Sequence, residues 1–370
     1  MRSAIHVTGR GAVSSAGWGV EPMYDAVMAG TPLPFMIQKR SEGAPESRVR
    51  KVPALSPAPD WMKHNRMRRT TVAARHAVGA AMQALGPERL AKAQSQDPMW
   101  RVGVIFCTMN GCVQFSRRFF AEALQDPKLA SPILFPETVH NAPASHIAAL
   151  LGSPEMNYTL VGDSSQFLRG LDMGAMWLDD GQVDAALVVA AEELDWVTDE
   201  AMLLFHREGI VAEGAAAVLL ERRADIEPAG PGAAGDRRTV ALAAVTEAHT
   251  YGKGLTMTEA ARRMQIELED ATKAESQAEV VLFDGRGAGP KVDPAEIAAW
   301  AGWNGGRVSV RPVLGEGYGV TGGWQTVIAC ESVARGTCKV AMVSGVGLGE
   351  QAVGAVLAAG ASGAHLTAPG

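Results

Sequence analysis

Short apolar runs alternate with longer helical patterns along the whole chain. The apolar runs are mostly continuous, as in AALVVAA at residues 185–191. Continuous runs of this length predict strands that helices cover on both faces of a sheet, as in layered α/β proteins. The predicted strands are residues 5–8, 102–107, 158–161, 185–190, 215–220, 240–245, 280–283, 340–343 and 353–357. The predicted helices are residues 69–85, 166–177, 258–271, 294–301 and 321–334.

One break in this pattern divides the chain. Residues 224–237 (ADIEPAGPGAAGDR) replace the apolar periodicity by Pro, Gly and charged residues, which is typical of a surface connection. The two parts that it separates share their element order and spacing: a helix and then a strand run from Ser164 to Asp184, and again from Gly319 to Lys339. The sequence therefore predicts a duplicated fold with a first half at 1–223, a linker at 224–237 and a second half at 238–370.

Composition narrows the function classes. A chain of 370 residues with 47% hydrophobic and 20% charged residues is too apolar for disorder and long enough for one large or two fused domains. A net charge of −6 argues against a nucleic-acid or membrane-surface partner, and the longest apolar runs are too short to span a bilayer. The four cysteines form no CxxC pair, and the glycine-rich segments lack a phosphate-loop context. We therefore expect a cytoplasmic protein without metal or other cofactor.

Six segments, in order, resemble motifs of the β-ketoacyl synthases. IHVTGRGAVSSAGWGV resembles their start, FPETVHNAPASHIAALLG their segment before the nucleophile strand, and HREGIVAEGAAAVLLE their GEGA segment. DGRGAGPKVDPAEIAA is similar to their HGTGT motif with the following DPIE, LGEGYGVTGG to their GHxxGAAG motif, and GVGLGEQA stands where they have a GFGG gate. The resemblance covers nearly the whole chain. It implies an α/β protein with the duplicated, five-layered αβαβα fold of the thiolase type, which is normally dimeric.

The same resemblance implies where the catalytic residues would lie. In a ketosynthase, a cysteine at a helix N-terminus attacks the acyl thioester, and two histidines support decarboxylation of the malonyl group. Here the cysteine position falls on Ser164, the histidine positions fall on Asp284 and Glu316, and the lysine before the second histidine motif falls on Arg311. A serine hydroxyl without a base is a poor nucleophile, and two carboxylates would repel a developing enolate. Ordinary condensing activity is therefore not expected of this chain.

One branch of the family lacks the cysteine as a rule. The chain-length-factor subunits of type II polyketide systems pair with an active ketosynthase, shape the shared acyl cavity, and carry a VGEQ-like sequence where the cysteine would be. Residues 161–164 (VGDS) are similar to it. The resemblance implies a non-catalytic partner subunit of a type II polyketide or fatty-acid-like synthase. Its partners would be an active ketosynthase, or a second copy of the chain, and an acyl carrier protein.

Two other functions stay open. An atypical acyltransferase or hydrolase would use Ser164 as nucleophile with Asp284 or Glu316 as base, and an acyl-ligand-binding homodimer would carry out no chemistry. The plainer interpretation of Ser164 is a helix cap or a passive pocket residue. Asp284 and Glu316 form either a new acid/base or metal-binding pair or, more plainly, partners of backbone amides and of Arg311, which is best placed to neutralise both.

The remaining candidates line the pocket or the subunit interface. Asp163 precedes the cysteine position, Leu348 stands at the gate position, and His206 lies beside the GEGA-like segment. We expect Ser164 at a helix N-terminus, and the four catalytic positions to converge on one pocket. The resemblance implies a dimer face at residues 109–120 and 135–149. The candidate interface residues there are Phe115, Phe119, Phe120 and Phe135.

Overall fold

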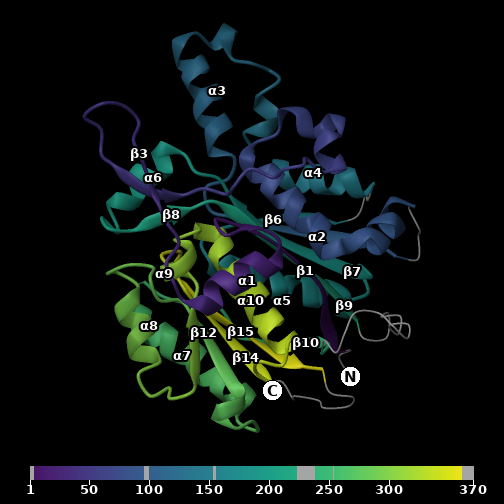
Figure 1. Ribbon diagram of the computed structural model, residues 1–370, viewed down its shortest axis with the longest axis vertical. Helices are drawn as coiled ribbons and strands as arrows, with labels where there is room; N and C mark the ends of the chain where they lie inside the picture. Colours follow the sequence, from purple (N-terminus) through teal and green to yellow (C-terminus); the bar gives the residue numbers. More distant parts are fainter. Residues whose placement is uncertain (1–3, 96–99, 153–155, 223–237, 253, 361–370) are drawn as a thin grey trace.

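The chain builds two five-stranded sheets that follow the same path. The structure is a computed structural model that describes residues 4–95, 100–152, 156–222, 238–252 and 254–360 (Figure 1). The strands of the first sheet are β1 (Ile5–Ser14), β5 (Val102–Thr108), β6 (Asn157–Val161), β7 (Ala185–Glu192) and β9 (Gly214–Arg222). Those of the second are β10 (Val240–Val245), β12 (Val280–Asp284), β13 (Gly306–Ser309), β14 (Val340–Val346) and β15 (Gln351–Ala359).

The topology of the two sheets is identical. Their spatial orders are β1-β9-β7-β5-β6 and β10-β15-β14-β12-β13, so the last strand of each half pairs with the first. In both sheets the three outer strands are parallel, and the last strand of the half is antiparallel to both of its neighbours. A short antiparallel contact at Val7 and Val240 joins β1 to β10, and through it the two sheets form one continuous path.

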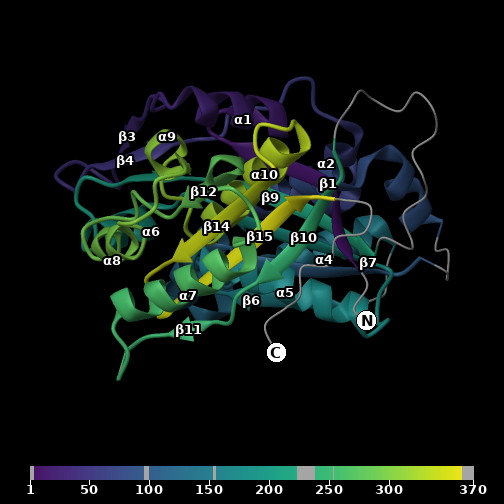
Figure 2. The same ribbon diagram turned by 90° about the horizontal axis from the view of Figure 1, so that it is seen from below.

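Helices complete five layers. The layer between the sheets holds α5 (Ser165–Asp179) and α10 (Thr321–Ala334), which contact each other and strands of both halves. The outer layer of the first half is α2 (Val72–Gln94) with α4 (Ala142–Leu151), and that of the second is α7 (Met257–Thr272) with α8 (Asp293–Ala299). Figure 2 shows α7 beside β14, β15 and β10. The expected duplicated αβαβα fold is confirmed, whereas the linker at 224–237 lies outside the described residues and stays a prediction.

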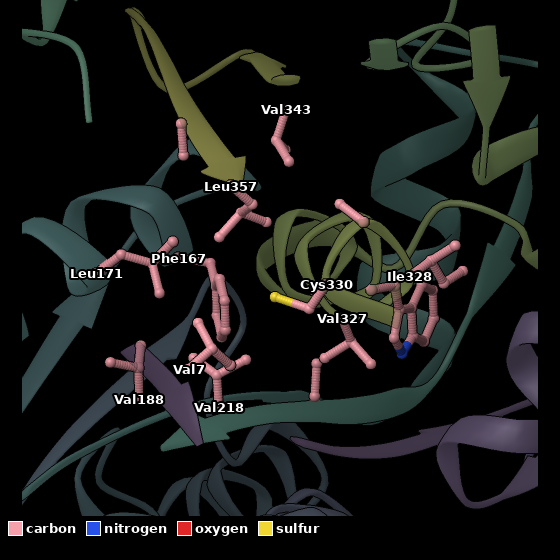
Figure 3. Packing of buried hydrophobic residues seen from close by; sticks show 14 of the residues in the cluster. Val7, Phe167, Leu171, Val188, Val218, Val327, Ile328, Cys330, Val343 and Leu357 are labelled. Carbon is pink, nitrogen blue, oxygen red and sulfur yellow. The ribbon is translucent and has the colours of Figure 1, made fainter. Parts of the chain in front are cut away.

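The helix α10 in the central layer has no face toward the solvent. Each of the fourteen residues of α10 is buried, because strands or helices surround it on every side. Figure 3 shows side chains of α10, such as Val327 and Cys330, between Phe167 of α5 and strands of both sheets. Gly322 allows the closest approach, since a Cβ atom there would lie 2.0 Å from the carbonyl oxygen of Ser164. Glycine at this position therefore lets the first turn of α10 rest on the start of α5.

All nine predicted strands are present, and the helix predictions hold with one instructive difference. The pattern predicted a helix that ends at residue 85, and α2 continues to Gln94 only across a kink at Gly86 and Pro87. Gly86 is not helical there (φ 66°, ψ 173°), and Pro87 begins the second segment. The predicted end therefore marks the kink.

The elements that the pattern did not predict lie around the site or on the surface. They are α1 (Val20–Ala29), α3 (Val113–Gln125), α6 (Trp196–Leu203), the short α9 (Arg311–Leu314), α4 and β13. A small sheet consists of β3 (Met36–Gln38), β4 (Ser47–Arg50) and β8 (Ile210–Ala212), while β2 (Gly17–Trp18) and β11 (His249–Thr250) pair with β1 and β15. None of the residues of α3 is buried, so its apolar positions belong to no core of this chain.

Candidate functional site

Ser164 lies where β6 leads into α5, at the centre of the molecule. It is buried and occupies the residue before the first residue of α5, as expected. Its hydroxyl does not cap the helix, because Ser164 itself has helical dihedral angles (φ −53°, ψ −28°). The preceding Asp163 acts as the cap instead: its Oδ1 accepts from the backbone N–H of Ser165 at 3.1 Å. Of the two plainer interpretations of Ser164, the helix cap is therefore wrong, because that role belongs to Asp163, and the passive pocket residue stays a prediction.

Arg311 holds the site together. Its Nη2 donates to the hydroxyl oxygen of Ser164 at 3.2 Å, and its Nε donates to Oε2 of Glu316 at 2.6 Å. Its Nη1 donates to the carbonyl oxygen of Gly285, the residue after Asp284. The guanidinium group is buried and thus bridges the nucleophile position, the second histidine position and the loop of the first. A planar group with five donors is suited to such a bridge.

Both carboxylate oxygens of Glu316 accept hydrogen bonds from neighbouring groups. Its Oε1 accepts from the backbone N–H of Tyr318 at 2.8 Å and from Oγ1 of Thr321 at 2.9 Å, while Oε2 accepts from Arg311. Its backbone is fixed as well, because its N–H donates to the carbonyl oxygen of Ile210 of β8 at 2.7 Å. The carboxylate is a structural group of the buried network.

Asp284 has a backbone amide among its partners, the N–H of Arg286 at 3.3 Å, but its other partners are not the expected Arg311. It ends β12, and its carboxylate accepts from Nε of Arg286 at 2.6 Å and from Oγ of Ser309 at 2.5 Å, with Nη1 of Arg307 at 3.5 Å. The parallel register places Ser309 of β13 directly beside it. Of these two carboxylates, Arg311 therefore pairs with that of Glu316, and the expectation that it serves both is wrong.

The structure joins three of the four catalytic positions directly. Ser164, Arg311 and Glu316 share one hydrogen-bonded network, and Asp284 touches it only through Gly285. Two cavities of about 430 and 510 Å³ lie away from this network, one on α3 and one between the 3₁₀ helix η1 (Asp60–Lys63), α2 and α4. Among the described residues, no group of three or more His, Cys, Asp or Glu side chains is arranged to hold a metal ion.

The network disfavours nucleophilic chemistry at Ser164. A serine needs a group that accepts its proton, and the partner of the Ser164 hydroxyl is a guanidinium group, which only donates. Glu316 is joined to Ser164 only by way of Arg311, and its oxygens already accept three hydrogen bonds. The geometry gives Ser164 a fixed, hydrogen-bonded hydroxyl without a base.

The three pocket candidates lie in different places. The carboxylate of Asp163, next to Ser164 in the chain, accepts hydrogen bonds from the backbone N–H groups of Ser165 and Gly349. Leu348 is half-buried and packs against the hydrophobic core that α7 and α8 form with the second sheet. His206 is half-buried, with its ring against Gly209 and Gly289. Among the described residues, no hydrogen bond or ion pair joins His206 to the Arg311 network, and its place in the pocket stays a prediction.

The candidate interface residues gather on and near α3. Phe120 and Phe135 are 63% and 56% exposed, and the Phe119 and Phe135 rings lie 5.5 Å apart. Phe115 is half-buried and lines the cavity of about 430 Å³. Figure 1 shows α3 standing out from the rest of the molecule. These side chains are available for a partner.

Sequence reasoning missed two buried glutamates beside the network. Glu296 of α8 accepts from the N–H of Gly285 at 2.9 Å and is hydrogen-bonded to Oγ of Ser344 at 3.0 Å. Glu192 at the end of β7 accepts from the N–H groups of Met109, Asn110 and Gly319. The signal for the first was the glutamate in DPAEI, and for the second a carboxylate at the end of an apolar strand.

These glutamates give the stability of the protein a distinctive pH dependence. Burial raises the pKa of Glu296 to about 7 against an ordinary value of 4.5. In the same way, burial raises the pKa of Glu192 to about 8. The folded chain keeps these protons at pH values where the unfolded chain has lost them. Glu296 therefore stabilises the fold fully below pH 4.5, and this contribution falls by about 1.4 kcal/mol per pH unit until pH 7.

We predict that Glu296→Gln removes this fall. The amide replaces the protonated acid and does not titrate. The free energy of unfolding of the variant minus that of the wild type should therefore be about 2 kcal/mol larger at pH 8 than at pH 5. Urea denaturation at both pH values measures it. The exposed Glu279→Gln variant controls for the loss of one carboxylate, and an equal pH dependence of Glu296→Gln and wild type would contradict the prediction.

Comparison with known proteins supports the fold. No protein-family model matches the sequence, and no curated protein sequence matches it either. Among solved structures, the ishigamide ketosynthase/chain length factor is 17% identical with a TM-score of 0.76 and covers 96% of this chain and 99% of that one. A type II polyketide synthase acyl-carrier protein complex with its ketosynthase is 18% identical with a TM-score of 0.76 and coverages of 97% and 100%.

A third structure agrees with these two. A ketosynthase in complex with its chain length factor from Xenorhabdus doucetiae is 17% identical, with a TM-score of 0.72 and coverages of 97% and 98%. The expected likeness to ketosynthases and chain length factors is confirmed for the fold, which is the thiolase-like fold of these proteins. None of the helices in the described part of the chain has both the length and the apolar character needed to cross a membrane.

Proposed function

We propose that this chain is a non-catalytic, chain-length-factor-like subunit that pairs with an active ketosynthase in a type II polyketide or fatty-acid-like synthase. The observation that carries the proposal is the buried Arg311, which binds Ser164 and Glu316 at once. The positions at which a ketosynthase holds its nucleophile and one of its histidines are thereby committed to structural bonds. The chain keeps a ketosynthase-like fold, but the hydroxyl of Ser164 has no base beside it among the described residues.

A partner surface supports the same function. β6 is the edge strand of the first sheet, and Val161 at its end pairs with Thr108, directly before Met109 and the start of α3. The large exposed apolar side chains of β6, of α3 and of the segments that flank α3 include Met109, Phe120, Leu124, Phe135, Tyr158 and Val161. An unpaired strand edge with apolar neighbours favours pairing with another chain. A dimer through it would bury more than about 2,000 Å².

The neighbours favour a heterodimer and a carrier protein. Two of the similar structures pair a ketosynthase with a chain length factor, and one includes an acyl carrier protein. We extend these partners to this chain as part of the proposal, together with a cytoplasmic location. In this assembly the chain supplies shape to the acyl cavity, and the partner ketosynthase supplies the cysteine.

The proposal predicts that Ser164 is not acylated. The purified chain and a cysteine-bearing ketosynthase are each incubated with an acyl thioester of N-acetylcysteamine, and their intact masses are measured. The ketosynthase should gain the acyl mass, while this chain should not, because Arg311 cannot take the serine proton. An adduct on this chain that disappears in Ser164→Ala would contradict the proposal and favour the serine acyltransferase or hydrolase.

A further inference from the structure

Residues 113–141 form an arm that contributes almost nothing to the hydrophobic core. The arm runs from the start of α3 through the 3₁₀ helices η3 (Pro127–Leu129) and η4 (Phe135–Glu137) to the residue before α4. Leu134 is its one buried residue, and none of its side chains belongs to the hydrophobic clusters of the described structure. Figure 1 shows how far its helix α3 stands out from the body of the molecule. A segment with so few buried apolar contacts opens at a low cost in free energy.

The two ends of the arm lie side by side. Gly111, just before α3, has φ 63°, and a Cβ atom there would lie 2.7 Å from the ring of His140 at the other end. Glycine adopts this φ without strain and leaves room for the ring. Across the same two ends, Oγ of Ser116 lies 2.8 Å from the carbonyl oxygen of Thr138. Because the arm leaves and rejoins the body at one place, it can turn there as a unit.

The first anchor of the arm is an ion pair with the body. Nε of Arg117 lies 3.0 Å from both carboxylate oxygens of Asp195, and its Cζ lies 5.5 Å from the centroid of the Trp196 ring. The Asp195 side chain is 4% exposed, whereas that of Arg117 is 40% exposed. One turn earlier, the backbone N–H of Gln114 donates to Glu193 at 2.9 Å. The helix α3 therefore rests on the end of β7 and the start of α6 through polar contacts.

The second anchor lies near the other end of the arm. His146 of α4 is 5% exposed, and its Nε2 lies 2.9 Å from both carboxylate oxygens of Glu137 in η4. Among the described residues, Nδ1 of the same ring has no hydrogen-bond partner, so the polar contact of the ring is with the arm. Two buried side chains of the body, Asp195 and His146, thus hold the arm near its two ends.

We propose that residues 113–141 are a hinged arm that opens as one unit about its adjoining ends, and that Asp195 and His146 are the positioning residues that set its closed position. In this position the arm presents Phe120 and Leu124, which are 63% and 72% exposed, to the solvent. The angle of the arm therefore determines where these side chains meet a partner. This consequence for the partner rests on the proposed function, whereas the hinge does not.

Hydrogen exchange in the full-length chain tests the hinge. Arg117→Met breaks the first anchor, and Glu137→Ala breaks the second. In either variant the hydrogen-bonded amides of the whole arm should exchange about tenfold faster than in the wild type, because each charged hydrogen bond stabilises the closed arm as a unit. The amides of β5 and β7 should keep their rates. Arg118→Met is the matched control: Arg118 pairs with Glu122 of the same helix at 3.1 Å, so exchange should rise about twofold at most.

The double variant Arg117→Met/Glu137→Ala should exchange about a hundredfold faster over the arm, since both anchors hold the same closed position. A rise confined to the turn that carries the altered residue would overturn the proposal, because it shows local fraying without a hinge. An unchanged rate, an equal rise in Arg118→Met, or an equal rise in β5 and β7 would overturn it as well.

A variant on the body side keeps the test sharp should Arg117→Met fail to fold. Asp195→Asn retains the size of a buried side chain behind the arm but loses the charge that Arg117 binds. Faster exchange throughout residues 113–141 in this variant supports the hinge. An unchanged rate contradicts it.

Discussion

Replacing Arg311 by methionine should destabilise the protein by about 4 kcal/mol, because the change leaves the buried carboxylate of Glu316 without its cation. The same change removes the donors to the Ser164 hydroxyl and to the Gly285 carbonyl oxygen. Unsatisfied buried polar groups add to the cost. Urea denaturation of the purified variant at neutral pH measures the free energy of unfolding.

Two further variants separate the charge from the size of the side chain. Arg169→Met breaks a half-buried ion pair with Asp172 near the surface and should cost less than about 1 kcal/mol. The double variant Arg311→Met/Glu316→Gln should regain part of the loss, since no unpaired charge remains in the interior. The account of the network would be wrong if Arg311→Met were as stable as Arg169→Met.

Replacing Val161 by lysine should abolish assembly with a partner. Val161 is 54% exposed at the end of the edge strand β6, within the proposed interface. A lysine that is buried there without a counter-charge costs several kcal/mol, which corresponds to a loss of affinity of about a hundredfold or more. Sedimentation velocity of the co-expressed proteins measures the fraction in the complex.

Ile266→Lys is the matched control for this variant. Ile266 lies on α7 and is 56% exposed, so its replacement makes the same chemical change on a different element. It should leave assembly unchanged. If Val161→Lys assembled as well as Ile266→Lys, β6 would not be part of the interface.

The sequence predicted the layers of the fold more reliably than the surface elements. Continuous apolar runs specify buried strands whatever their neighbours, and all nine predicted strands are present. The helix α3 escaped prediction because none of its residues packs into a core of this chain. We expect a partner surface to cover its apolar side chains. A pattern of positions buried within one chain does not predict such a surface.

The site divides in the same way. The motifs pointed to Ser164, Arg311 and Glu316, and these three residues share one hydrogen-bonded network. The partners of Asp284 depend on the register of β12 with β13, which brings Ser309 beside it. The cap on α5 depends on the backbone conformation of Ser164. Because its dihedral angles are helical, the capping role moves one residue back, to Asp163. The spacing of the motifs predicts neither the partners of Asp284 nor the cap on α5.

The most direct test of the central claim is a reconstituted condensation assay. The chain alone, a cysteine-bearing ketosynthase alone, and both together are supplied with acyl and malonyl carrier proteins, and carbon–carbon bond formation is measured. The account predicts no product from the chain alone, product from the pair, and no change of that product in the pair with Ser164→Ala. Steady carbon–carbon bond formation by the chain alone, abolished by Ser164→Ala, would contradict it.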